Sequence, residues 1–163
     1  MDDPLLRFWF RFVYPELSYL RQASPSQGYQ TVSAPHLDAY YGHCFERLCR
    51  EALAAIYGNE RIPTRFEIGS YWDKAVQIDV VGHRSDGRID LGECKWGKEL
   101  SAPALVREIE RKRKLYPNPS GSTLRPMVFT RFPMGTIPED VMHYSLEDLY
   151  DERGERNSKL DVR

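Results

Sequence analysis

The runs QIDVVGHR at residues 77–84 and RIDLGECKW at residues 88–96 decide the fold of this chain. In each run apolar and polar side chains alternate, which predicts two β-strands. The Ser-Asp-Gly between them suits a three-residue hairpin connection in which Gly87 takes the left-handed conformation. This connection pairs Arg84 with Arg88 and so sets the register of the whole hairpin.

The register determines which side chains share a face. It places Asp79 opposite Glu93, whereas a two-residue Asp-Gly turn would place Asp79 opposite Cys94 and send the two carboxylates to opposite faces. Lys95 lies two residues beyond Glu93 and shares its face. Three ionisable groups on a half-buried face cost free energy unless they pair with one another or bind something. Asp79, Glu93 and Lys95 are therefore the first candidate site residues.

Composition restricts the possible classes of protein. The chain has 163 residues, 41% hydrophobic and 29% charged, which is typical of one soluble domain with a core. The net charge of −1 requires any nucleic-acid affinity to come from a local patch. No apolar run is long enough to cross a membrane. Three cysteines without metal-site spacing favour the reducing cytoplasm.

We predict three parts along the chain: an aromatic N-terminal helix and linker at residues 1–32, the main domain at residues 33–150 and a charged tail at residues 151–163. Asp3-Pro4 is a typical helix start, and Pro15 is expected to end this helix. The helix is apolar on most of its circumference, so it must pack internally or contact a partner. Residues 22–33 are expected to form a linker.

A second helix is predicted from residue 33 to about Tyr57. Glu46 does not lie on its most polar face, so we expect this carboxylate to point inward or along the edge of a cleft. Two alternatives remain open: an ordinary surface pair with Arg50 at i+4, and joint metal binding with His43 at i−3. The main apolar stripe of this helix is predicted to comprise Leu37, Tyr41, Cys44, Leu48, Ala52 and Ala55.

A third helix is predicted over residues 101–116. Leu105, Ile109 and Lys112 follow one side, and the cations of another side are Arg107, Arg111 and Lys114. Such a basic row is either a solvated face or a set of phosphate contacts. Further strands are expected at residues 64–72, before the hairpin, and at residues 125–131 and 141–144. The predicted order, helix, three strands, helix and strand, gives an α/β fold with a mixed sheet flanked by helices.

These residues resemble a known superfamily. Glu46 on a helix, Asp79 on a strand and the triplet Glu93-Cys94-Lys95 resemble the PD-(D/E)XK nucleases, whose restriction-endonuclease-like core has the order αβββαβ. More narrowly, residues 3–13, the run YGHCFE at residues 41–46, Trp72 and GECKW at residues 92–96 are similar to the uncharacterised C-terminal domain of archaeal-type P-loop ATPases.

Two departures from these patterns matter. The chain has no Gly-x-x-x-x-Gly-Lys-Ser/Thr loop, so it cannot bind ATP in the manner of those ATPases. We therefore expect a C-terminal fragment of such an ATPase, or a chain that has lost its motor. The proline that often precedes the first acidic residue of the nuclease motif is also missing before Asp79.

The resemblance implies a metal-dependent endonuclease that hydrolyses DNA. It implies that Mg²⁺ or Mn²⁺ is held by Asp79, Glu93 and the backbone carbonyl of Cys94. Lys95 would orient a metal-bound water, and Glu46 would hold a further water or a second ion. Arg107, Arg111 and Lys114 would then hold the DNA backbone.

Alternative interpretations remain open from sequence. Asp79, Lys95 and Glu93 could form an ion-pair network without a metal. The chain could be a catalytically inactive nuclease-fold module that binds DNA or regulates a partner P-loop ATPase. In that case the aromatic N-terminal helix would contact the ATPase or form a homodimer. A third alternative is a toxin-like effector nuclease with a narrow target.

Overall fold

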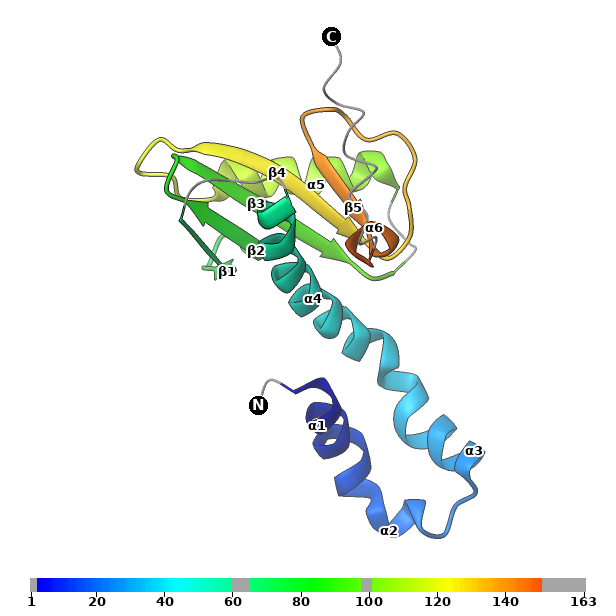
Figure 1. The fold of residues 1–163 in the computed structure, drawn as a ribbon. Coiled ribbons are helices and arrows are strands. Elements are labelled where there is room, and N and C mark those ends of the chain that lie inside the picture. Colours follow the sequence, from blue (N-terminus) through cyan, green and yellow to red (C-terminus); the bar gives the residue numbers. More distant parts are fainter. Residues whose placement is uncertain (1–2, 60–64, 98–100, 151–163) are drawn as a thin grey trace. The chain divides into compact units, whose positions relative to one another are not determined.

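The computed structural model describes residues 3–59, 65–97 and 101–150 (Figure 1). The chain divides into two compact units, residues 1–44 and residues 45–163. The division lies within helix α4 (Leu37–Asn59), whereas the sequence predicted a boundary at residue 33. The predicted tail at residues 151–163 lies outside the described residues. Among those that are described, no helix has the length and apolarity needed to cross a membrane.

The N-terminal unit begins as predicted, but its helix does not end at Pro15. The Asp3 carboxylate accepts the Leu6 N–H at 2.8 Å and caps the first turn. Before Pro15 the chain widens into a π turn, in which the Tyr14 N–H bonds to the carbonyl of Trp9. The wider turn admits a residue that lacks an N–H, so the helical path continues. Its segments are α1 (Pro4–Phe8), the π turn Trp9–Val13, the 3-10 turn Tyr14–Glu16 and α2 (Leu17–Leu20).

The predicted linker at residues 22–33 is also wrong, because most of it is helical. Ser24 and Gln27 form a reciprocal capping box that starts a new helix. A second π turn precedes Pro35, with the Ala34 N–H bonded to the carbonyl of Tyr29. The Ser, Gln and Gly residues of this stretch suggested a loop. The capping box instead starts a helix, and the π turn before Pro35 lets it continue. The segments are α3 (Pro25–Gly28), the π turn Tyr29–Ser33 and the 3-10 turn Ala34–His36, which leads into α4.

The second unit contains a five-stranded mixed sheet in the order β1-β2-β3-β4-β5. The first three strands form an antiparallel meander, and α5 (Ala102–Leu115) crosses over to β4, which is parallel to β3. The predicted edge strand is β5, parallel to β4. The order α4-β1-β2-β3-α5-β4 confirms the predicted α/β fold. The strands are β1 (Phe66–Trp72), β2 (Gln77–Arg84), β3 (Arg88–Lys95), β4 (Thr123–Thr130) and β5 (Met142–Ser145).

The hairpin register agrees with the prediction. Val80 pairs with Gly92 and His83 pairs with Ile89, which is the register that sets Asp79 level with Glu93. Gly87 has φ of 80°, a conformation that favours glycine and permits the three-residue turn. Local turn chemistry thus positions the two carboxylates.

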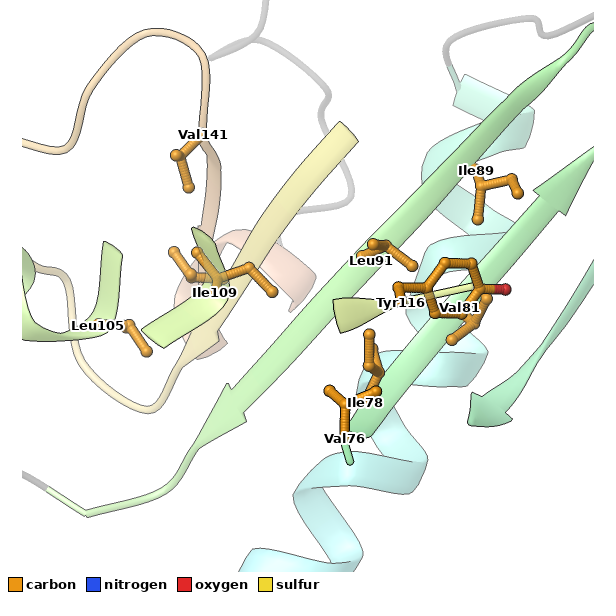
Figure 2. Close-up of a cluster of buried hydrophobic side chains, with 10 residues drawn as sticks. Val76, Ile78, Val81, Ile89, Leu91, Leu105, Ile109, Tyr116 and Val141 are labelled. Atoms are coloured by element: carbon orange, nitrogen blue, oxygen red, sulfur yellow. The ribbon is translucent and has the colours of Figure 1, made fainter. Parts of the chain in front are cut away.

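Helices pack on both faces of the sheet. On the α5 face, Figure 2 shows Val81, Ile89 and Leu91 of the hairpin in one buried cluster with Leu105 and Ile109 of the helix. All five side chains are at most 4% exposed. The prediction that Leu105 and Ile109 lie on one side of their helix is confirmed.

On the other face, the α4 stripe predicted from sequence is wrong. Tyr41 and Ala55 of that stripe are exposed, while the next row of the helix is buried. This row brings two large aromatic rings against the sheet, which buries more apolar area than the alanine-rich row would. Its buried members within the second unit are Phe45, Cys49, Leu53 and Tyr57, packed against Val80, Met127 and Phe129.

Candidate active site

Asp79 is held at the point where the β2–β3 ladder ends. Its Oδ2 accepts the backbone N–H of Cys94 at 3.0 Å, so the side chain takes the place of a ladder hydrogen bond. From α4, Arg50 donates to the backbone carbonyl of Asp79 at 2.9 Å. Asp79 is 8% exposed. Backbone and side chain are both fixed, which gives this carboxylate one orientation.

Glu93 lies between two ammonium groups. Lys95 approaches its Oε1 at 2.7 Å, and Lys112 of α5 donates to its Oε2. Glu108, one turn before Lys112 on the same helix, lies 3.4 Å from Lys95 and 3.8 Å from Lys112. The carboxylate of Glu93 is only 2% exposed. We call Asp79, Glu93, Lys95, Glu108 and Lys112 the hairpin cluster.

Burial and neighbouring charges shift the pKa values of Glu93 and Lys95. Burial raises the pKa of Glu93, the negative charge of Asp79 raises it further, and the bonds from Lys112 and Lys95 only partly offset this. Burial lowers the pKa of Lys95, but the hydrogen bond and charge of Glu93 outweigh it and leave the pKa raised. Lys95 therefore carries its positive charge at neutral pH.

The ion-pair alternative predicted from sequence needs a correction in its members. Lys95 does pair with Glu93, but the Asp79 carboxylate accepts a hydrogen bond from the backbone N–H of Cys94. The second cation on Glu93 is Lys112, which the sequence placed on the same side of α5 as Leu105 and Ile109 without assigning it a role. The sequence did contain a signal for this role: Lys112 lies three residues after Ile109 in an apolar row, where a lysine needs a buried partner.

Glu46 lies half-buried on α4, on the side of the helix that carries the buried Cys49 and Leu53. This agrees with the prediction that it is not on the most polar face. The α4 side chain that contacts Asp79 is Arg50, one turn further along. Arg50 was expected from sequence only as a surface partner of Glu46. Arg47 and Glu51, at i and i+4 on the same helix, form an ion pair at 2.7 Å.

The predicted basic row of α5 points away from the sheet. Arg107, Arg111 and Lys114 are all exposed, whereas Lys112 is buried. The helix thus carries these three cations on its outward side and Lys112 on its inward side. The outward row is accessible to a ligand, and the inward charge belongs to the hairpin cluster.

The hairpin cluster has donor chemistry that suits a hard divalent cation. Its three carboxylates outnumber its two ammonium groups. Burial raises the pKa of Glu93 most and the negative charge of Asp79 raises it further, and a bound cation would relieve this repulsion between the two carboxylates. Carboxylate and carbonyl oxygens are the preferred ligands of Mg²⁺. Across residues 3–59, 65–97 and 101–150, no group of three or more His, Cys, Asp or Glu side chains is arranged as a complete metal site. A cation here would thus need a backbone carbonyl, water or substrate oxygen as further ligands.

Comparison with known proteins places the chain in a family. A family model described as DUF234, archaeal and bacterial proteins of unknown function, matches residues 9–112. The chain belongs to the DUF234 family. No curated protein and no solved structure matches it. The DUF234 match extends from the N-terminal unit to Lys112, so it includes every member of the hairpin cluster.

Proposed function

We propose that this DUF234 protein is a metal-dependent nuclease of the PD-(D/E)XK type that hydrolyses DNA phosphodiester bonds. The observation that supports this most is the register of the hairpin, which sets Asp79 level with Glu93 and places Lys95 at 2.7 Å from Glu93. One end of the hairpin thus carries two carboxylates, which could bind a cation, and one ammonium group, which could stabilise negative charge. The order of helices and strands is compatible with the core of that superfamily.

Each residue has a chemical role in this proposal. Asp79, Glu93 and the Cys94 carbonyl would hold Mg²⁺ or Mn²⁺, which activates water and offsets charge on the phosphate. Lys95 remains protonated and would stabilise negative charge that develops on the phosphate oxygens. Lys112 orients Glu93 through its other oxygen. The outward row of α5, Arg107, Arg111 and Lys114, would contact the DNA backbone.

The role of Glu46 differs from that of the other candidates. It is half-buried on α4, whose buried face packs against the side of the sheet opposite to α5. We propose that Glu46 holds a water or second ion only at the edge shared with Arg50 and Asp79. Glu46→Gln should therefore weaken cleavage less than Asp79→Asn does.

One observation favours a second candidate function. Each oxygen of Glu93 already pairs with an ammonium group. A non-catalytic scaffold would also neutralise a buried carboxylate in this way. In that case the protein would bind DNA or a partner P-loop ATPase without cutting. Exposed apolar side chains in the N-terminal unit, including Leu5 at 75% and Tyr14 at 58%, would serve as the contact to the ATPase or to a second copy.

Titration with Mn²⁺ by calorimetry, together with cleavage of labelled DNA, tests the proposal. The wild type should bind Mn²⁺ and cut DNA, and Asp79→Asn should abolish both. Lys95→Met should keep metal binding and lose cleavage. Asp140→Asn, which removes an exposed carboxylate, is the matched control and should change neither property. If the wild type neither binds Mn²⁺ nor cuts DNA, the nuclease proposal is refuted and the non-catalytic scaffold remains.

A further inference from the structure

A cavity opens beside the hairpin cluster, at the carboxyl ends of two parallel strands. Lys95 of β3 and Thr130 of β4 pair in register at this edge, and α5 begins close by at Ser101. The cavity has a volume of about 540 Å³, within the range of about 300–1,000 Å³ typical of small-molecule sites. Ligands of α/β proteins bind preferentially outside the carboxyl ends of strands. We call it the Lys95 cavity.

The lining of the Lys95 cavity suits a flat apolar body with a polar edge. Leu105, Phe132 and Met134 provide an apolar wall, and Phe132 is 37% exposed, so its ring is accessible. The Ser101 hydroxyl lines the cavity and makes no capping hydrogen bond to α5. An aromatic face beside a few polar groups is the arrangement on which nucleobases stack.

One cation lines the cavity, and a second contacts the ring of a residue that lines it. Lys95 lines it while its ammonium group lies 2.7 Å from Glu93, so the cavity begins at the hairpin cluster. The guanidinium of Arg131 lies 4.8 Å from the ring centroid of Phe132 and 4.4 Å from that of Trp96. Cation–π contact with both rings stabilises Arg131 next to Phe132, which lines the cavity. A strand whose phosphates contact these cations would have a base within reach of the cavity.

We propose that the Lys95 cavity accepts an unstacked nucleobase of a DNA strand whose phosphate lies at the hairpin cluster, so that the substrate is single-stranded or locally unpaired DNA. This inference rests on the proposed nuclease function and specifies its substrate. Duplex DNA would have to unpair and unstack the base before it could enter, which costs free energy. Single-stranded DNA should therefore bind more tightly than duplex of the same length.

A variant that fills the cavity provides the test. Gly135 lines the cavity, and a Cβ at this position would meet no atom within 4 Å, so Gly135→Trp can occupy the space without displacing the core. Gly69→Trp is the matched control, since Gly69 has equally open surroundings on β1. Phe132→Ala is a second variant that removes the stacking surface instead of filling the space.

Affinity is measured by fluorescence anisotropy without divalent cations, using single-stranded DNA of about ten nucleotides. The matched probe has the same length and carries abasic sugars throughout. The wild type and Gly69→Trp should bind the base-containing strand roughly tenfold more tightly than the abasic strand. Gly135→Trp should lose this preference while its affinity for the abasic strand stays unchanged. Phe132→Ala should also lose the preference, and its affinity for the abasic strand can fall as well, because Arg131 contacts the Phe132 ring. Equal binding of the two strands by the wild type, or a preference that survives in both cavity variants, overturns the proposal.

Cleavage of the same strands with Mn²⁺ separates this inference from the nuclease function. If the wild type cuts DNA but discriminates neither bases nor strandedness, the nuclease stands and the base-binding cavity is refuted. If the wild type shows the base preference and never cuts, base binding is supported and the nuclease is refuted.

Discussion

Replacing Lys112 by methionine should lower the free energy of unfolding by about 2 kcal/mol when no divalent metal is present. Lys112 bonds to Glu93 inside the protein, where the two side chains are 10% and 2% exposed. Removing one partner of an isolated buried pair costs about 3–5 kcal/mol. Here Lys95 stays 2.7 Å from the other oxygen of Glu93, so the loss should approach that of one charged hydrogen bond, about 1.5–3 kcal/mol.

Equilibrium unfolding in urea at neutral pH measures this loss. Methionine keeps the aliphatic stem of Lys112, so little cavity is created. Lys114→Met, on the exposed side of the same helix, is the matched control and should change the free energy of unfolding by less than about 0.5 kcal/mol. For a chain of this size the expected fall in Tm is about 4–8 °C. Equal stability of Lys112→Met and Lys114→Met would show that the ion pair between Lys112 and Glu93 does not stabilise the fold.

The same variant also distinguishes a metal site from an ion-pair network. Removing a competing positive charge should increase the affinity of the hairpin cluster for Mn²⁺. At about 100 times its Kd, the metal should then raise the free energy of unfolding of Lys112→Met by about 2.7 kcal/mol. If Mn²⁺ stabilises neither the wild type nor Lys112→Met, the cluster is a structural network and the nuclease proposal loses its main support.

Three further outcomes are expected. Burial lowers the pKa of His143 below its ordinary 6.5, so the unfolded chain binds a proton more readily, and stability should fall as the pH drops through 6.5. Urea titrations between about pH 5 and pH 8 should show this fall flattened in His143→Gln. Gly82→Ala would drive a methyl group into the Tyr57 hydroxyl and should cost about 1–3 kcal/mol. In a double-mutant cycle with Tyr57→Phe the two losses should be less than additive, and strict additivity would contradict that contact. Arg111→Ala and Lys114→Ala should each reduce the salt dependence of DNA binding by about one unit of log–log slope, and an unchanged slope would exclude them as phosphate contacts.

Much of the second unit could be predicted from sequence because local rules control it. Alternation and the Ser-Asp-Gly turn predict the hairpin, and the turn determines that Asp79 lies level with Glu93. The spacing of Leu105, Ile109 and Lys112 correctly predicts that they share one side of α5, and in the structure this side is buried. These features depend on residues that are close together in the chain.

The errors in the N-terminal unit came from turn geometry that composition does not reveal, and the error on α4 came from contacts with distant residues. Proline and polar residues suggested that the N-terminal helix ends at Pro15, but π turns carry the helical path past both Pro15 and Pro35. On α4 several rows are apolar, and contact with the sheet selects the row that contains Phe45 and Tyr57. Local spacing cannot rank these rows, because their burial depends on the surface opposite them.

The sequence alone determined the hairpin, its register and the shared face of Asp79, Glu93 and Lys95. Only the tertiary structure decided the partners of these groups: Lys112 and Glu108 arrive from α5, and Arg50 arrives from α4. A hairpin register follows from the geometry of one turn. A buried charge finds its partners only after a crossover helix has packed on the sheet, since packing brings residues that are far apart in the chain within hydrogen-bond distance.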